Sequence, residues 1–531
     1  MKKISILDCT LRDGGYVNNF SFGRKSIDCI IEGLSQSFVD IIECGFLKSN
    51  SNDENKTLFS SVQAIQKHIK SKSSNTMYVA MIQYGAIGLD EIIDNDGKSI
   101  DGIRLTFHEH EIDDAYEMAQ NLISKGYKVF FQPVGTTSYS DISLLELVNK
   151  VNKLKPYAFY IVDTLGKMYK KDILHMFYLV DHNMDERIAL GFHSHNNLQM
   201  SFANAQEITQ LNINRHLIID SSILGMGRGA GNLNTELLAQ YLNVNFGCKY
   251  DIFKLMSLLD SQIQPLTVSY KWGYHPSYYL AAISDSHPNY ASFLMNKSTL
   301  KITDIRSILL GLDSSKRNLF DKQYIQEIYT KYMDYKVNDD ETLDIIKSFV
   351  KNRNVLILAP GKSLQSQKDK ICNFANDKHC FVVSVNFIPE TIHVNMVFSS
   401  NIKRFDNEII NHISDLQSKN IQVVITSNIK TDDSFCLKVN YSSYLADDLD
   451  FSDISDNAGL MCLNLFKSIG VCNFYLAGFD GFTDSAKDNY FNNSLAYDID
   501  EERAAKLNLG FYNKISQLRS SVSISYVTES R

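Results

Sequence analysis

Apolar runs of six to eight residues recur along the first half of the chain, and segments with helical periodicity lie between them. The runs predict strands over residues 4–9, 39–46, 77–82, 102–107, 128–134, 158–164, 188–194 and 216–222. The intervening helical periods are clearest over residues 26–36, 142–154 and 198–211. Eight strand-then-helix units in about 245 residues are typical of a (β/α)₈ TIM barrel, with a doubly wound open sheet as the competing arrangement.

The pattern changes after the eighth unit. Residues 250–345 are helical and aromatic without clear strands, and a charged stretch over 334–353 precedes a second α/β series that begins at residue 354. Its further strands are predicted over 381–387, 394–400, 421–427 and 472–480. We therefore expect an α/β protein of three parts, namely a TIM-barrel domain (1–249), a helical extension and linker (250–350) and a Rossmann-like α/β domain (351–531).

Composition narrows the class of protein. The 531 residues carry a net charge of −8, which argues against nucleic acid or an anionic membrane as the main partner. The nine cysteines form no C-x-x-C pair, so a reduced cytoplasmic protein is expected rather than a disulfide framework or zinc knuckle. No apolar run is long enough for a membrane span, and the N-terminal one is too short for a signal peptide.

Unusual polar residues follow three of the predicted barrel strands. Arg12 and Asp13 follow the first, and Asn232 ends a glycine-rich segment after the eighth. His193 and His195 end the seventh and point to one face, because side chains alternate along a strand. Barrel closure makes these strands neighbours, so Asp13, His193, His195 and Asn232 are expected to converge at the end where barrel active sites lie.

A carboxylate, two imidazoles and an amide oxygen suit Mn²⁺ or Mg²⁺, and Zn²⁺ or Fe²⁺ would also tolerate them. Each motif alone has an ordinary interpretation. A histidine pair can cap or fill a core, an Arg-Asp pair can be a local salt bridge, and a glycine-rich turn can be only a turn. The prediction of a metal site depends on all three motifs lying at the same end of adjacent strands.

Four stretches resemble the metal-dependent pyruvate aldolases, including 4-hydroxy-2-oxovalerate aldolase. These belong to the superfamily of 3-hydroxy-3-methylglutaryl-CoA lyase, isopropylmalate synthase and homocitrate synthase. The stretches are L-D-C-T-L-R-D-G-G-Y (7–16), V-D-T-L-G-K-M (162–168), G-F-H-S-H-N-N-L-Q-M-S-F-A-N-A (191–205) and G-M-G-R-G-A-G-N (225–232). The resemblance covers roughly residues 4–295, since 272–282 and 287–291 look like the helical domain that follows the barrel in the aldolases.

The resemblance implies a role for each matched residue. Asp13, His193 and His195 would bind the metal, with Asn232 as a further ligand or close neighbour. Arg12 would contact the enolate oxygen. The substrate pocket would also be lined by His108 and Thr164.

Tyr16 departs from the family pattern, because the pyruvate aldolases carry a histidine there as the general base. A phenol is a poorer base at neutral pH, so proton transfer would fall to Tyr16, to another residue or to a metal-bound water. This difference predicts a substrate other than the small catabolic hydroxy-oxo acids.

The leading hypothesis is a metal-dependent carbon–carbon lyase or aldolase that acts on a 2-oxo acid, such as pyruvate, and an aldehyde. Aldolases of this kind are commonly homo-oligomers. A Claisen-type acyl-CoA synthase is the second hypothesis. Those synthases commonly carry Arg-Glu-Gly-Glu-Gln after the first strand, whereas Arg12-Asp13-Gly14-Gly15 favours the lyases and aldolases. A third hypothesis treats the barrel as an inactive scaffold, with the function in the C-terminal domain.

The C-terminal domain offers weaker motifs. A-P-G-K-S-L (359–364) is no P-loop, because Leu356 stands where that motif requires a glycine, although a helix N-terminus there could still meet an anion. Residues 383–387, 399–405, 457–461 and 476–482 resemble bacterial domains linked to sugar transfer in surface-glycan pathways. A structural or oligomerising domain is the alternative.

A nucleotide sugar would be the ligand of such a domain, and a fusion with an aldolase suggests the biosynthesis of an unusual sugar or surface polysaccharide. The candidate ligand-binding residues all lie at predicted strand ends. They are Gly361, Ser363, Asn386, Asn401, Lys403, Arg404 and Asp480.

Overall fold

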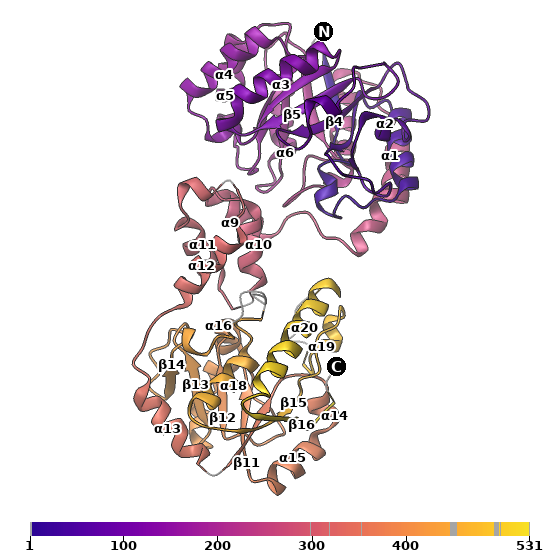
Figure 1. The fold of residues 1–531 in the computed structure, drawn as a ribbon. Helices are drawn as coiled ribbons and strands as arrows, with labels where there is room; N and C mark the ends of the chain where they lie inside the picture. Colours follow the sequence, from indigo (N-terminus) through magenta and orange to yellow (C-terminus); the bar gives the residue numbers. More distant parts are fainter. Residues whose placement is uncertain are drawn as a thin grey trace. The chain divides into compact units, whose positions relative to one another are not determined.

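The computed structural model of the chain describes residues 3–297, 299–317, 319–351, 353–446, 454–492, 499 and 501–529. It divides into two compact units, one of residues 1–292 with 313–320 and one of residues 293–312 with 321–531 (Figure 1). The domain boundaries expected at 249 and 350 remain predictions. Among the described residues, no helix combines the length and apolar character needed to cross a bilayer.

Eight parallel strands form a closed barrel in the first unit. Their neighbour order is β1-β9-β8-β7-β6-β5-β4-β2, and β1 pairs with β2 to close the ring. The (β/α)₈ prediction is confirmed, with every barrel strand within about two residues of its predicted place. The strands are β1 (Ile4–Asp8), β2 (Ile41–Leu47), β4 (Met77–Gln83), β5 (Gly102–Phe107), β6 (Lys128–Pro133), β7 (Ala158–Asp163), β8 (Ala189–Ser194) and β9 (Leu217–Ser221), with a two-residue β3 (Leu58–Phe59) beside β2.

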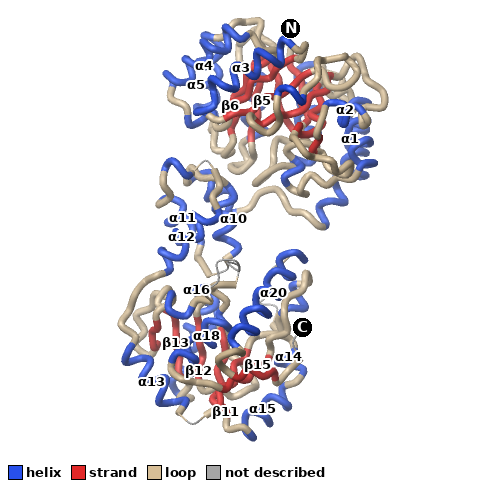
Figure 2. Tube along the Cα trace, viewed as in Figure 1, coloured by secondary structure: helices blue, strands red, loops and turns tan. Residues whose placement is uncertain are grey.

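Helices surround these strands, as Figure 2 shows in blue around red. After β4 the chain makes only a short 3₁₀ turn, so one of the eight units lacks its helix. Gly85 and Gly97 in that connection adopt positive φ, which interrupts a helix. The helices are α1 (Arg24–Gln36), α2 (Val62–Gln66), α3 (Ile112–Ser124), α4 (Asp141–Leu154), α5 (Lys170–Asn183), α6 (Ser201–Gln210) and α7 (Thr235–Phe246), with 3₁₀ turns η1 (Gly14–Tyr16), η2 (Leu89–Glu91), η3 (Glu109–Glu111), η4 (Thr136–Ser138) and η5 (Ile223–Gly225).

The barrel encloses its own small core, separate from the larger core between strands and helices. Phe130, Tyr160 and Ile218 are among the buried residues that fill the inside. Gly191 on β8 leaves room for one of them, because a Cβ at this position would lie 2.3 Å from the Tyr160 ring. The side chains inside the ring therefore fit closely around the strand that carries His193.

A helical segment follows the barrel. Within the first unit, the Trp272 indole donates to the Leu224 carbonyl oxygen at 3.0 Å, which holds this segment against the loop after β9. The elements are α8 (Ile252–Leu258), η6 (Leu259–Ile263), η7 (Gln264–Val268), α9 (Pro276–Ile283), α10 (Pro288–Asn296), α11 (Ile302–Leu310), η8 (Ser314–Lys316), α12 (Lys322–Met333) and α13 (Asp340–Val350).

The second unit contains an open parallel sheet of order β14-β13-β12-β11-β10-β15-β16, which confirms a Rossmann-like arrangement. The strand order reverses between β10 and β15. Two strands escaped prediction, β14 and β16. Both lie at sheet edges and are only partly buried, so they lack an apolar run. The strands are β10 (Asn354–Leu358), β11 (Cys380–Val385), β12 (Met396–Ser399), β13 (Gln422–Thr426), β14 (Cys436–Val439), β15 (Asn473–Ala477) and β16 (Ser523–Tyr526).

Short helical pieces and three longer helices connect these strands. The longer ones are α15 (Lys368–Asp377), α18 (Ala458–Ser468) and α20 (Glu501–Leu518). The short ones are α14 (Ser363–Ser366), α16 (Ile402–Arg404), η9 (Phe405–Ile409), η10 (Ile410–His412), α17 (Ile413–Ser418), η11 (Ser442–Tyr444) and α19 (Ala486–Asn489).

The close fit at Gly191 leads to a stability prediction. Gly191→Ala should lower the free energy of unfolding by about 1–3 kcal/mol, because the new methyl group meets a buried aromatic ring. Urea unfolding followed by circular dichroism measures the change. As a control, Gly311→Ala places its Cβ no closer than 3.5 Å to other atoms and should shift stability by less than about 0.5 kcal/mol. Equal stability of the Gly191 variant and the wild type would contradict the packing described.

Candidate active site

Two histidines and an aspartate meet at the carboxyl end of the barrel. Asp13 lies in the turn after β1, His193 lies on β8, and His195 follows that strand. The Nε2 atoms of His193 and His195 lie 3.4 and 3.8 Å from the same Asp13 oxygen, Oδ2. All three side chains are buried. The strand alternation that predicted a common face for the histidines therefore holds, and neighbouring strands bring the carboxylate to them.

Asn232 reaches this cluster through the glycine-rich loop. An isolated bridge pairs its backbone with that of His195. Positive φ at Gly225 and Gly231 turns the loop, and a Cβ at Gly231 would lie 2.0 Å from the Gly225 carbonyl oxygen. The Asn232 Nδ2 donates to the Met226 carbonyl oxygen at 3.3 Å. The other atom of this amide, Asn232 Oδ1, takes no part in that hydrogen bond.

The donor atoms of the cluster fit a divalent cation. Among the described residues, Asp13 Oδ2 and Asn232 Oδ1 are buried with no hydrogen-bond partner, and His195 Nε2 lies beside the first of them. An unpaired buried carboxylate oxygen is costly, and a cation removes that cost. Burial is the main cause that lowers the pKa of His195 to about 3, so the ring is neutral, which is the form that binds metals. Two oxygens and two imidazoles suit Mn²⁺ or Mg²⁺.

Cys9 also lies within this group, since its sulfur, Asp13 and His193 offer atoms within 4.8 Å of one another. Its Sγ donates to the Ser221 carbonyl oxygen at 3.2 Å, and burial raises the pKa of the thiol well above its usual value. Cys9 therefore lies in the wall of the site, beside the carboxylate and imidazole donors.

Arg12 is held by a buried carboxylate on the adjacent strand β2. Its Nε donates to Glu43 Oε2 at 2.8 Å, and its Nη1 lies 3.3 Å from Asp13 Oδ1. Nη2 is buried and has no hydrogen-bond partner among the described residues. One edge of the guanidinium is thus fixed, while one nitrogen stays available beside the carboxylate cluster.

A second buried arginine connects Glu43 to the histidine side of the cluster. Arg104 on β5 donates to Glu43 Oε2 at 2.8 Å and also to Asp220 on β9. Asp220 Oδ2 lies 2.9 Å from His193 Nδ1 and Oδ1 accepts from the Tyr160 hydroxyl at 3.0 Å. When Nδ1 donates to this carboxylate, the His193 lone pair at Nε2 faces Asp13, which is the arrangement seen behind metal-binding histidines.

Sequence reasoning missed this network, although a signal was present. Glu43, Arg104 and Asp220 are charged residues inside apolar strand patterns, V-D-I-I-E-C-G-F, G-I-R-L-T-F and H-L-I-I-D-S-S. A charge at a strand position that otherwise faces a core is rarely left unpaired. Three such positions on one barrel indicate a shared buried network.

Tyr16 lies at the mouth of the barrel, in the turn that begins with Gly14. Its ring contacts Phe20 and Phe46 edge-on, with centroids 5.2 and 6.1 Å away. The Arg228 guanidinium lies over the same ring, 4.0 Å from its centroid. The ring is 39% exposed, so the residue that replaces the aldolase histidine borders the open side of the site.

His108 and Thr164 lie at the same end of the barrel, after β5 and β7. His108 stacks on His110, and the Thr164 hydroxyl accepts from the Gly135 backbone N–H at 2.9 Å. Within the described parts of the chain, neither forms a hydrogen bond with Asp13 or the two histidines. Their role in lining the substrate pocket remains a prediction.

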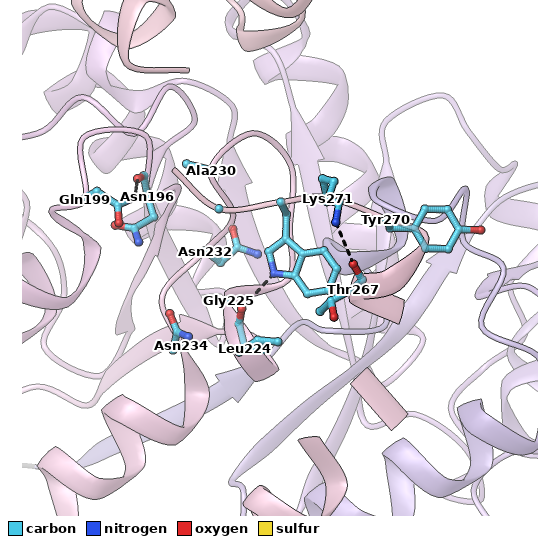
Figure 3. Close-up of a pocket in the computed structure, with 12 residues that line it drawn as sticks. Asn196, Gln199, Leu224, Gly225, Ala230, Asn232, Asn234, Thr267, Tyr270 and Lys271 are labelled. Atoms are coloured by element: carbon cyan, nitrogen blue, oxygen red, sulfur yellow. Dashed lines mark hydrogen bonds between the residues drawn. The ribbon is translucent and has the colours of Figure 1, made fainter. Parts of the chain in front are cut away.

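A pocket of about 480 Å³ lies behind the glycine-rich loop (Figure 3). Its wall is mostly polar and includes Asn196, Gln199, Asn234 and Lys271. Asp13 and the two histidines do not line it, so Asn232 is the residue that it shares with the cluster. The pocket is therefore distinct from the cluster of Asp13, His193 and His195.

In the second unit, the Asp480 carboxylate occupies the turn at residues 359–364, where the sequence allowed for a bound anion. It accepts from the Ser363 backbone N–H at 2.7 Å and from the Ser363 hydroxyl. Gly361 is packed against Gly478, where a Cβ would lie 2.3 Å from the carbonyl oxygen. The chain's own carboxylate thus occupies the N-terminus of the short α14, and a phosphate there would meet a like charge.

The remaining C-terminal candidates lie near the ends of β11 and β12. Asn386 accepts from the Ser399 hydroxyl at 3.0 Å, and Asn401 accepts from the backbone N–H groups that begin α16. Burial lowers the pKa of Lys403, and the Arg404 guanidinium lies 5.4 Å from the centre of the Tyr490 ring. The asparagines therefore have structural partners, and the ligand role of the whole set remains a prediction.

Several known proteins are similar to the first half of this chain. The family model described as HMGL-like matches residues 3–261. A 4-hydroxy-2-oxovalerate aldolase from Geobacillus genomosp. 3 is 25% identical over 272 residues, which cover 50% of this chain and 77% of that protein. An oxaloacetate decarboxylase from Mycobacterium tuberculosis is 24% identical over 245 residues, 45% of this chain and 69% of that protein. The HMG-CoA lyase structure from Brucella melitensis aligns with a TM-score of 0.41 at 14% identity, covering 50% of this chain and 99% of that one.

The buried network predicts a large stability loss when one of its cations is removed. Arg104→Met should lower the free energy of unfolding by about 3–5 kcal/mol, because Glu43 and Asp220 would lose a buried partner. Arg187→Met is the matched control, since Arg187 pairs with Asp185 at the surface and its loss should lower stability far less. Urea unfolding of both variants measures the difference, and equal losses would contradict a network that depends on Arg104.

Asp220→Asn should weaken Mn²⁺ binding about 10- to 100-fold, because an amide does not hold the His193 ring as a carboxylate does. Isothermal titration calorimetry measures the dissociation constant. Tyr160→Phe removes a different hydrogen bond of Asp220 and leaves its contacts with His193 and Arg104 intact, so its loss of affinity should be smaller. An unchanged constant for the Asp220 variant would show that this carboxylate does not orient a metal ligand.

Proposed function

Residues 3–261 form an HMGL-like domain of the DRE-TIM metallolyase superfamily, and from that premise we propose that the protein is a divalent-metal-dependent lyase or aldolase. It makes or breaks a carbon–carbon bond next to a 2-oxo acid through the enolate of pyruvate. The observation that carries this proposal is the convergence of Asp13, His193 and His195 around one buried, unpaired carboxylate oxygen. Arg12 Nη1 lies 3.3 Å from the other oxygen of the same carboxylate, Asp13 Oδ1.

Asp13, His193 and His195 would hold the metal, with Asn232 as a fourth donor. A bound divalent metal supplies Lewis-acid stabilisation of the negative charge that develops on the 2-oxo oxygen. His193 is fixed for this role by Asp220, and the carboxylate of Asp13 stays ionised. Although burial opposes it, the charge of the neighbouring Arg12 keeps the pKa of Asp13 well below its usual value.

Arg12 would donate a hydrogen bond to the same oxygen as charge builds up on it. Its Nη2 has no partner among the described residues, while Glu43 and Asp13 fix the rest of the guanidinium. A donor that is already in place when charge develops stabilises the transition state more than the ground state. The buried position also excludes water, which strengthens this interaction.

Tyr16 would hold and move the proton of the hydroxyl group on the aldehyde side. Support comes from its place three residues after Asp13, where the pyruvate aldolases carry a histidine, and from its exposed position at the barrel mouth. His108 and Thr164 would help to line the pocket at the same end of the barrel.

The C-terminal unit would bind a nucleotide sugar, which would place the reaction in the biosynthesis of an unusual sugar or surface polysaccharide. The candidates at its strand ends support this, because open α/β sheets bind ligands at the carboxyl ends of their strands, where the strand order reverses. Asp480 would then act as a hydrogen-bond acceptor for sugar hydroxyls rather than as part of a phosphate site. The protein would work as a cytoplasmic homo-oligomer with Mn²⁺ or Mg²⁺.

Two enolate assays test the proposal. The wild type with Mn²⁺ should decarboxylate oxaloacetate and should exchange the methyl protons of pyruvate with D₂O, as followed by NMR. Asp13→Asn and His193→Ala should lower both rates at least about 100-fold, because each removes a metal ligand. Asp185→Asn, at a surface ion pair, is the control and should leave both rates unchanged.

Absence of both reactions in the metal-loaded wild type would refute the proposal. Consumption of an acyl-CoA together with a 2-oxo acid would instead support the Claisen-type synthase. The aldehyde partner can then be sought by adduct formation with excess pyruvate.

A further inference from the structure

Arg228 is a cation at the barrel mouth that has no carboxylate partner among the described residues. Its guanidinium lies over the Tyr16 ring, and its Nη1 lies 3.4 Å from His287 Nε2. Among the residues that the structure describes, no carboxylate oxygen lies within 4.0 Å of it. Elsewhere in the same mouth, Arg12 pairs with Glu43 and Lys167 pairs with Asp285. A ligand that binds Arg228 therefore has no carboxylate of the described residues to displace.

The loop that carries Arg228 is held in place. Asn197 is fully buried, and its Oδ1 accepts from the Ala230 backbone N–H at 2.9 Å while its Nδ2 donates to the Leu165 carbonyl oxygen at 2.9 Å. Gly229 adopts positive φ, and a Cβ there would lie 2.7 Å from Asn197 Oδ1. A fixed loop presents the guanidinium at low entropic cost for binding.

His287 offers a second donor beside this guanidinium. The side chain is only 7% exposed, and burial, followed by the charge of Arg228, lowers its pKa to about 3. A neutral imidazole has one acceptor nitrogen and one N–H. Nδ1 accepts from the Asn289 backbone N–H at 3.2 Å, so Nε2 carries the hydrogen.

The two groups therefore face each other as donors. Arg228 Nη1 and His287 Nε2, 3.4 Å apart, cannot satisfy each other when both carry hydrogens. An oxygen with several lone pairs between or above them would accept from both. Carboxylates and phosphates are such acceptors, and arginine binds them with two parallel hydrogen bonds.

We propose that Arg228 and His287 form an anion-binding subsite that takes a carboxylate or phosphate carried by the aldehyde substrate. This inference rests on the proposed aldolase function. The 2-oxo acid already has Arg12 and the metal ligands as its partners, so the separate cation serves the other half of the reaction. Tyr16 contacts Arg228 through its ring and follows Asp13 by three residues in the chain, so the proposed proton-transfer residue borders the subsite.

Matched aldehydes test the subsite. Initial rates with pyruvate and Mn²⁺ are compared for glyceraldehyde 3-phosphate against glyceraldehyde, and for succinic semialdehyde against butyraldehyde. The wild type should favour one anionic member by at least about tenfold in kcat/KM, and Arg228→Gln should lower that preference about 10- to 100-fold. Arg228→Lys keeps the positive charge but cannot form two parallel hydrogen bonds, so it should lose part of the preference. The surface control Arg187→Gln should retain it.

Direct measurement of anion binding is a second test, and it does not require turnover. Calorimetry with inorganic phosphate and with acetate, in the presence of Mg²⁺, should show a dissociation constant that rises at least about tenfold in Arg228→Gln for one of the two anions. The anion affected identifies the chemistry of the substrate group. Circular dichroism confirms that each variant is folded.

The outcomes separate this inference from the function on which it rests. A wild type that forms the pyruvate enolate but treats charged and neutral aldehydes alike overturns the subsite and leaves the aldolase proposal standing. Unchanged binding of both anions in the Arg228 variant also overturns the subsite, whether or not the enolate forms. Loss of anion binding without any enolate would support the subsite and refute the aldolase.

Discussion

Arg104 has no exposed surface, and the arrangement of the candidate active site depends on it. A guanidinium in the interior of a barrel must be neutralised, and Glu43 and Asp220 do so from neighbouring parts of the ring. Glu43 in turn holds Arg12, and Asp220 holds His193. One buried cation thus connects the residue that would stabilise the enolate oxygen with a ligand of the metal, and neither can shift without disturbing the other.

The closed barrel lowers the free-energy cost of burying this network of charges. Charges buried in an apolar core cost stability unless their geometry is fixed, and a closed ring of parallel strands fixes the register of each side chain. Tyr160 joins the network through Asp220 and fills the space that Gly191 leaves. Packing and charge therefore support the same residue, His193, from two sides.

The mouth of the barrel divides into two chemically different parts. One part is the carboxylate and imidazole cluster with Arg12, which suits a metal and a 2-oxo acid. The other is formed by Arg228, His287 and the exposed edge of Tyr16, which suits an anion carried by a second substrate. In the C-terminal unit the carboxylate of Asp480 accepts from the Ser363 backbone N–H, so a phosphate at this turn would meet a like charge.

The sequence by itself determined the strands of the barrel and the common face of His193 and His195, because both follow from local periodicity, while the role of these residues as metal ligands remains a prediction. Apolar runs mark buried parallel strands, and the spacing of His193 and His195 places them on one face. Edge strands such as β14, which lack an apolar run, escaped this reasoning.

The tertiary structure alone decided which charges meet. Gly15 also shows what local sequence cannot tell. A glycine suggests a turn that needs positive φ, but the φ of Gly15 is not positive. Glycine is required there because a Cβ would lie 2.2 Å from the Phe20 ring. Arg228 meets His287, 59 residues further along, only because the helical segment folds back over the barrel mouth. Such contacts depend on closure and packing between distant segments, which no local pattern records.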